Sequence, residues 1–289
     1  MSQPIEDHDL GFQHDLPRLI GRRRALSLLG GVGLAAAGGL PAQAARCFAL
    51  PWETEGPFPA DGSNGRGGRA LNLLPRAGVV RDDLRSSFGP MMPVADGVAL
   101  ELELTLVNAD GCTPLEDHAI YLWHCDAAGR YSLYDLPDAN YLRGVGVTDS
   151  DGEVGVTTIV PGCYAGRWPH IHFEIFESAD AAVAGARSLL TSQIALPEMA
   201  AAEVYRTGGP YGDALRNLRR VGIPRDTVFR DNTPQQLAQQ TLSMSGDPED
   251  GYTGTLTIPV DLNADRHSAA GPRPGEASGA LPPPTRLKR

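Results

Sequence analysis

The stretch GRWPHIHFEIF, residues 166–176, alternates between two kinds of side chain. Neighbouring side chains on a β-strand point to opposite faces, so Ile171 and Phe173 would share one face of such a strand. His170 and His172 would lie together on the other face. An apolar face is typical of a core, and a face that carries two histidines is typical of a site. The stretch therefore predicts a strand with core on one side and a functional site on the other.

A period of two recurs along the chain, and it indicates the fold class. In VALELELTLV, residues 98–107, leucines alternate with glutamate and threonine, as in a strand with one buried face. Further strands are expected at 119–125, 152–160, 169–176, 189–196 and 252–260. Residues 47–93 read mostly as extended loop, 233–242 as a short helix, and 178–188 as a short helix or a loop insertion. The pattern predicts an all-β protein with a β-sandwich core, long loops and few short helices.

The first 44 residues have the composition of an export signal. Arg22, Arg23 and Arg24 precede a Gly/Ala/Leu run, and Ala42-Gln43-Ala44 offers a small-residue cleavage site. The arginines suggest the twin-arginine route. The apolar run is shorter than a spanning helix usually needs, and a retained membrane anchor is the alternative. We therefore expect a signal peptide over 1–44, a sandwich domain over 45–262 and a disordered Pro/Gly-rich tail over 263–289.

Charge and cysteines restrict the partners and the compartment. The formal net charge is −10, which argues against nucleic acid and anionic membranes as partners. An even number of cysteines in an exported protein suggests disulfides. Three pairings are possible, and the sequence does not choose among them. The cysteines are Cys47, Cys112, Cys125 and Cys163.

Two tyrosines near the histidines extend the candidate site. Tyr164 stands six residues before His170, and Tyr131 follows the turn at Gly129. Two tyrosines and two histidines offer two oxygen and two nitrogen donors to a metal. A free tyrosine, with a pKa of about 10, becomes a strong ligand only when a cation of high charge density removes its proton. Ferric iron suits that task better than zinc or ferrous iron.

With these residues in place, the sequence resembles a known family, the intradiol ring-cleavage dioxygenases. The resemblance covers roughly residues 47–262, and it looks closest to the protocatechuate β-subunit branch and its exported single-chain relatives. The motifs that carry it are TEGPFP (54–59), VVRDDLR (79–85), WHCDAAGRYS (123–132), VPGCYAGRWPHIHFEIF (160–176) and LLTSQIALP (189–197).

The resemblance implies a role for each site residue. Tyr131, in Gly-x-Tyr-Ser, would stay on Fe(III), and Tyr164 would leave the metal when substrate binds. His170 and His172 would complete the ligand set. Two further residues have implied catalytic roles: Arg167 would stabilise negative charge on the ring, and Gln193 would support the site. The implied activity is cleavage of an aromatic diol by O2, between its two hydroxylated carbons, to a cis,cis-muconate-type product. The preferred catechol and the oligomeric state stay open.

Other interpretations of the same residues exist. Tyr134 competes with Tyr131 as a ligand, and Arg167 could form an ordinary ion pair with Glu174 or Glu177. A cupin-type metal enzyme would use the two histidines with Glu177, although that fold also expects a later histidine. A third interpretation is an exported, non-catalytic β-sandwich that has lost its metal and binds carbohydrate or another protein. His124 is expected to be a structural histidine.

Overall fold

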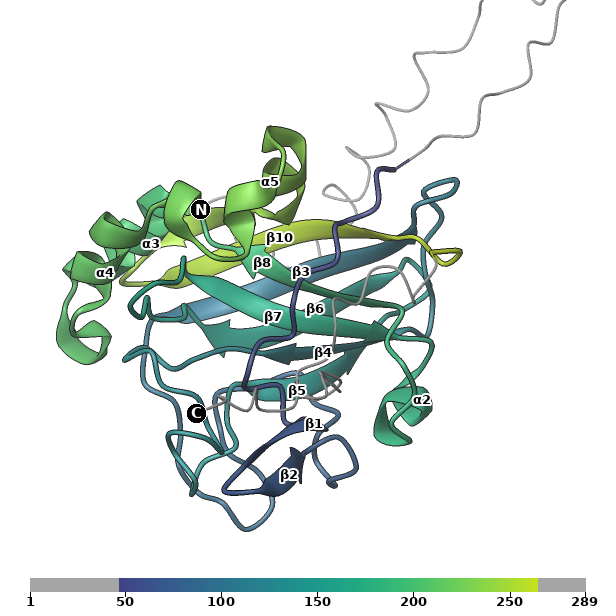
Figure 1. Cartoon of the computed structure of the whole chain (residues 1–289), viewed down its shortest axis with the longest axis horizontal. Coiled ribbons are helices and arrows are strands. Elements are labelled where there is room, and N and C mark those ends of the chain that lie inside the picture. The colour runs from purple at the N-terminus through teal and green to yellow at the C-terminus, as the bar shows by residue number, and fades with distance from the viewer. Residues whose placement is uncertain (1–46, 265–289) are drawn as a thin grey trace, which may run out of the picture. The chain divides into compact units, whose positions relative to one another are not determined.

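The computed structural model describes residues 47–264, and within them the chain forms two four-stranded β-sheets and a two-stranded hairpin (Figure 1). The first sheet has the order β6 (Glu153–Ile159), β3 (Ala99–Asn108), β10 (Gly251–Val260) and β9 (Ser243–Asp247). The second has the order β5 (Arg143–Val147), β4 (Ala119–Trp123), β7 (His170–Phe176) and β8 (Leu190–Ala195). The hairpin joins β1 (Asp61–Arg66) to β2 (Arg69–Asn72).

The predicted fold class is confirmed, and every strand expected from the sequence is present. Strands β1, β2, β5 and β9 were not predicted. The sequences of β1 (DGSNGR) and β9 (SMSGD) are mostly polar, β2 (RALN) has four residues, and β5 (RGVGV) has only two valines, so none gives a strong apolar alternation. Strands β5 and β9 pair along the edges of the four-stranded sheets, and β1 and β2 pair with each other. The predicted extended loop at 47–93 is therefore wrong over the β1–β2 hairpin.

The main core lies between the two sheets. Leucines 100, 102, 104 and 106 of β3 are buried against Ile171 and Phe173 of β7 and their neighbours. The alternation in β3 holds in detail, because Glu101 and Glu103 on its other face are exposed. Burial of apolar area at the usual ~25 cal/mol per Å² makes this face the main driving force for the sandwich.

The second sheet is also covered on its outer face. A smaller core forms there from Trp123, Tyr131, Val79 and other residues of the loops that cross the sheet. As a result, all seven residues of β7 are buried, including both histidines. The histidine face of β7 therefore lies under a layer of loops, where water is largely excluded.

Short helices flank the sheets, and two of them support the turn that precedes β7. They are α2 (Ala179–Val183), α3 (Glu198–Arg206), α4 (Ala214–Val221) and α5 (Pro234–Gln240), with single 3₁₀ turns at 209–211, 223–225 and 229–231. The Tyr205 hydroxyl of α3 donates to the Pro161 carbonyl (2.7 Å). Asn217 of α4 donates to the Cys163 carbonyl (2.9 Å). The two predicted short helical stretches are confirmed as α2 and α5, whereas α3 and α4 were not predicted.

One disulfide joins Cys47 to Cys112, while Cys125 and Cys163 are buried free thiols. The disulfide anchors the strap, residues 47–60, which then runs across the sandwich (Figure 1). Leu50 N donates to the Pro259 carbonyl of the first sheet, and Glu53 N donates to the Thr191 carbonyl of the second.

The expected signal peptide and almost all of the expected tail lie outside the described residues, and the predicted domain limits stay predictions. In the part of the chain that is described, no helix combines the length and the apolarity that a membrane span requires.

Candidate metal centre

Four side-chain donors converge over the outer face of the second sheet. The Tyr131 Oη lies 3.4 Å from His170 Nε2 and 3.3 Å from His172 Nε2. The Tyr164 Oη lies 3.4 Å from the Tyr131 Oη and 3.4 Å from His170 Nε2. The two Nε2 atoms lie 3.0 Å apart. Ligand distances of about 2.0–2.2 Å would place neighbouring donors about 3–3.5 Å apart around one ion, so the four predicted ligands do meet at a common point.

The two histidines are prepared to bind a cation. His170 Nδ1 lies 2.5 Å from the Trp168 carbonyl oxygen. A carbonyl can only accept, so Nδ1 carries the proton and Nε2 presents its lone pair to the centre. Burial, together with the positive charge of Arg167, lowers the pKa of His170, and burial likewise holds the pKa of His172 well below its usual value. The two Nε2 atoms face each other at 3.0 Å, so either the His172 Nε2 donates its proton to the His170 lone pair or a cation takes the place of that proton.

The two tyrosines differ in accessibility. Tyr131 is 2% exposed, and burial raises its phenol pKa well above the usual value. Tyr164 is partly exposed, and burial raises its pKa to about 12. Both phenols therefore stay protonated at neutral pH in the absence of a cation, and the donor set fits a metal that can displace phenol protons. The greater exposure of Tyr164 makes it the more replaceable of the two ligands.

Two glycines allow the chain to approach the ligands closely. Gly56 of the strap has φ +71°, and a Cβ there would lie 3.2 Å from His172 Cε1. Gly129 has φ +82°, and a Cβ there would lie 2.9 Å from the Tyr164 Cβ. A positive φ is costly for residues with a Cβ, and at both positions the side chain would also press on a ligand. Both glycines lie in motifs that carried the family resemblance.

Arg167 reaches the centre held by two partners. Its Nη2 donates to the Gln193 Oε1 (2.6 Å), and its Nε donates to the Asp226 Oδ2 (2.9 Å). Its Nη1 lies 3.5 Å from His170 Nε2. The β7–β8 register explains the place of Gln193, because it pairs directly with His172. Asp226 was missed from the sequence, although it lies in a segment with weak family resemblance.

The competing assignments are not supported by the geometry. The Tyr134 hydroxyl accepts from Ala60 N (3.0 Å) and takes no part in the centre. The ion pair of Arg167 is made with Asp226, and not with Glu174 or Glu177. His124 is 1% exposed and has partners for both nitrogens, the Cys125 carbonyl and Thr158, so it is structural, as expected.

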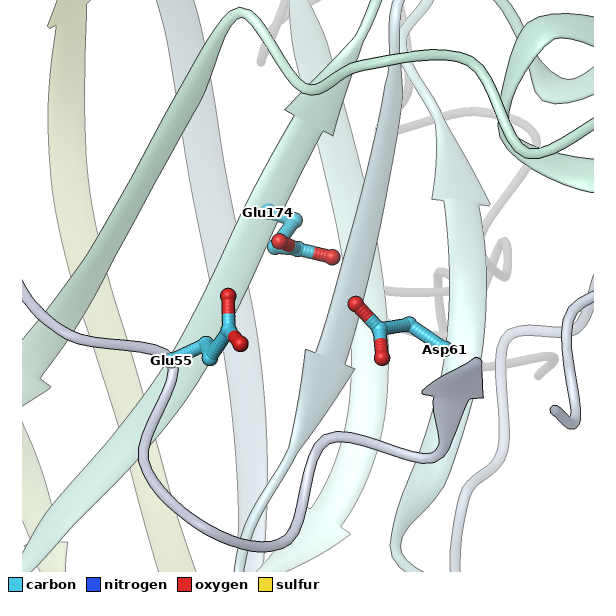
Figure 2. Close-up of side chains that lie close together, drawn as sticks. All are labelled: Glu55, Asp61 and Glu174. Carbon is cyan, nitrogen blue, oxygen red and sulfur yellow. The ribbon is translucent and has the colours of Figure 1, made fainter. Parts of the chain in front are cut away.

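A cluster of carboxylates from β7, the strap and β1 lies next to the candidate centre. Figure 2 shows Glu55, Asp61 and Glu174 with their carboxylates turned toward one another, and their nearest oxygens lie within 4.8 Å. Among residues 47–264, it is the one group of three His, Cys, Asp or Glu side chains with this spacing. Burial, with the negative charge of Asp61, raises the pKa of Glu174 to about 8. Thr191 donates to the Glu174 Oε1 (3.0 Å).

Comparison with known proteins agrees with this geometry. The family described as Dioxygenase matches residues 90–194, which include all four donors. No sequence among curated proteins matches the chain. An intradiol ring-cleavage dioxygenase from Tetranychus urticae is 22% identical, with a TM-score of 0.55, and the match covers 75% of this chain and 97% of that one. A second solved dioxygenase is also 22% identical, with a TM-score of 0.56 and coverage of 75% and 96%.

A third solved structure is the dioxygenase domain of a carbohydrate-binding fusion protein from Streptomyces sp. SirexAA-E. It is 24% identical, covers 74% of this chain and 99% of that domain, and has a TM-score of 0.44. At these identities the first two structures establish a shared fold. The motifs, the family match and the fold agree: residues 90–194 match the Dioxygenase family, and the chain shares the fold of a solved intradiol ring-cleavage dioxygenase.

Proposed function

We propose that this protein is a non-haem Fe(III) dioxygenase that cleaves a catechol between its two hydroxylated carbons, giving a cis,cis-muconate-type product. The observation that carries the proposal is the convergence of Tyr131, Tyr164, His170 and His172, whose donor atoms lie 3.0–3.4 Å apart. Two phenol oxygens and two imidazole nitrogens suit a small trivalent cation. When bound, ferric iron would draw electron density from a catecholate and open its ring to attack by O2.

Within this chain, Tyr164 would move the proton. As a ligand it is a phenolate, and its pKa of about 12 off the metal makes it a strong base. A catechol that takes its place on the metal would have to lose two protons: the released Tyr164 oxygen would accept one, and solvent would take the other. Tyr131 and the two histidines, all almost fully buried, would hold the metal throughout the cycle.

Arg167 would supply a fixed positive charge beside the ring. Its Nη1 points to the centre at 3.5 Å from His170 Nε2, where a bound catecholate would develop negative charge. Such a cation, oriented in advance in a site that excludes water, stabilises charge more than the same cation would in water. Gln193 would hold the other terminal nitrogen in place.

We also propose that the protein acts outside the cytoplasm, exported by the twin-arginine route. The support is the arginine, apolar and Ala-x-Ala pattern of residues 22–44. Cell fractionation checks it. A Lys-Lys substitution of Arg22 and Arg23 should retain the protein in the cytoplasm, and unchanged export would argue against this route.

The activity is tested by offering the iron-loaded protein a panel of catechols and following O2 uptake together with product absorption. The proposal expects one O2 consumed per ring and a muconate-type ultraviolet spectrum, with no activity in His170→Ala. Products that show cleavage of any ring bond other than the one between the two hydroxylated carbons would reject the proposal. A protein that binds no metal tightly and takes up no O2 with any catechol would favour the non-catalytic binding module.

The cupin alternative has less support. It requires Glu177 beside the two histidines, but no group of three such donors in residues 47–264 includes Glu177. The fold is also shared with intradiol enzymes.

A further inference from the structure

Asp226 receives an unusual set of contacts for a residue outside the ligand motifs. Its side chain is fully buried, and each carboxylate oxygen accepts two hydrogen bonds. Oδ2 accepts from Arg167 Nε (2.9 Å) and from Trp168 N (2.6 Å). Oδ1 accepts from Val228 N (2.8 Å) and Phe229 N (2.9 Å). All four partners are N–H donors. A carboxylate can accept from all of them, because both of its oxygens are acceptors, whereas an amide has only one acceptor oxygen.

The contacts fix the orientation of the Arg167 guanidinium. With Nε bound to Asp226 and Nη2 bound to Gln193, the remaining nitrogen, Nη1, must face the metal centre. The pair is well shielded from water, since the Arg167 side chain is 14% exposed and that of Asp226 is 0% exposed. The guanidinium is planar and its N–H groups point in fixed directions. With Nε and Nη2 both hydrogen-bonded, the group is held in a single orientation.

The same carboxylate also steadies the peptide that orients a metal ligand. Asp226 holds Trp168 N, and the Trp168 carbonyl accepts from His170 Nδ1 (2.5 Å). Asp226 itself is rigid, because its Oδ1 closes the turn between two 3₁₀ helices. Asp226, which lies in the 223–231 segment, thus supports the centre although it is 58 residues from Trp168 in the sequence.

We propose that Asp226 is a positioning residue that acts through Arg167: it holds the guanidinium so that Nη1 faces the substrate ring and the metal. The inference rests on the proposed function, since it concerns the charge that Arg167 presents to a catecholate. Asp226 touches neither substrate nor metal.

A double-mutant cycle in kcat and KM tests the proposal. Asp226→Asn should lower kcat at least tenfold, because a displaced catalytic group costs up to about a hundredfold. The KM for catechol should change much less. In an Arg167→Met background, Asp226→Asn should lower kcat by a clearly smaller factor than in wild type, because the guanidinium that it positions is already absent and only its support of the Trp168 peptide is lost. An equal loss in both backgrounds would show a purely structural role and overturn the proposal.

The matched control is Asp83→Asn. Asp83 makes a similar two-point contact with Arg85, but both side chains are over 40% exposed and neither contacts the centre. Surface pairs of this kind contribute little, so its kcat should match that of wild type. If Asp226→Asn does not fold, Arg167→Lys serves instead, because lysine keeps the charge but cannot bind Asp226 and Gln193 from two edges. A lysine variant with wild-type kcat would equally overturn the proposal.

The inference and the proposed function fail separately. An inactive wild-type protein would reject the function, and the orientation of Arg167 could still be read from crystal structures of wild type and Asp226→Asn. If wild type is active but the effects of Asp226→Asn and Arg167→Met on kcat are additive, the proposed function stands and the role of Asp226 is rejected. An Arg167 side chain that keeps its place in the Asp226→Asn crystal would also reject that role.

Discussion

At the scale of single residues, the site depends on how closely backbone can approach the ligands. The strap passes His172 at Gly56, where a Cβ would lie 3.2 Å from the ring. The His172 Nδ1 is buried without a partner among the described residues, so packing, more than hydrogen bonding, sets the plane of this ring. The ring also stacks on Trp123, with centroids 5.0 Å apart and planes 5° apart.

Gly56→Ala should weaken metal binding because its new methyl group would push the His172 ring. The substitution also carries a backbone cost of about 1–2 kcal/mol for a positive φ. Gly67→Ala separates the two effects, because Gly67 has φ +59° and nothing within 4 Å of an added Cβ. Iron titration and thermal unfolding check the prediction. Both variants should lose stability, but only Gly56→Ala should lose iron affinity, and equal affinities would contradict the packing argument.

The sequence predicted where the site side chains lie when the signal is local. His170 and His172 fall on one face because a strand alternates strictly, and Tyr131 and Tyr164 each follow a turn. Asp226 could not be recognised in the same way, since its partners are backbone amides and an arginine 59 residues earlier. Its role exists only in the folded chain.

At the scale of elements, β7 carries the candidate site on one face and core on the other. Its residues Ile171 and Phe173 belong to the main core, while His170 and His172 enter the candidate metal centre. The strands that the sequence did not predict lie at sheet edges or in the hairpin, where pairing partners compensate for weak local preference. The central strands β3, β4 and β7 were predicted because burial imposes a clear pattern on them.

The same strand gives the stability a pH dependence through Glu174. Its folded pKa of about 8 lies above its usual value, because the side chain is buried near Asp61. Between the two values the folded state keeps a proton that the unfolded state releases. The contribution of Glu174 to the free energy of unfolding is therefore complete below the pKa of this group in the unfolded chain. It falls as the pH rises from there to about 8, by up to ~1.4 kcal/mol per pH unit.

Denaturant unfolding of the metal-free protein between pH 5 and pH 8 measures this effect. Glu174→Gln should flatten the decline, since a neutral amide needs no proton. Glu116→Gln, at an exposed position, should leave the decline as it is. A Glu174→Gln variant with the full wild-type slope would assign the decline to other groups.

At the scale of the whole molecule, the strap links the two sheets to the candidate metal centre (Figure 1). It starts at the Cys47–Cys112 disulfide, is bonded to both sheets, and passes His172 at Gly56. Sequence could show that four cysteines were present, but not which of them pair, because the pairing depends on where the strap runs. The disulfide joins residues 65 positions apart.

Removing this disulfide should lower the free energy of unfolding by about 4 kcal/mol, because the unfolded chain would no longer be restricted by a closed loop of that length. Cys47→Ser with Cys112→Ser should unfold at a lower temperature, and a reductant should have no further effect on this variant. The wild-type protein should respond to the reductant. A double variant as stable as wild type would mean that the strap holds its place without the covalent link.

The central claim is a ferric ion bound by two tyrosinates and two histidines, and visible absorption of the iron-loaded protein tests it most directly. Tyrosinate bound to ferric iron absorbs strongly, so wild type should be reddish. Tyr131→Phe and Tyr164→Phe should each shift and weaken the band, His170→Ala should lose iron, and Tyr134→Phe should match wild type. A colourless iron-loaded protein, or a band that is unchanged in both Tyr131→Phe and Tyr164→Phe, would contradict the account.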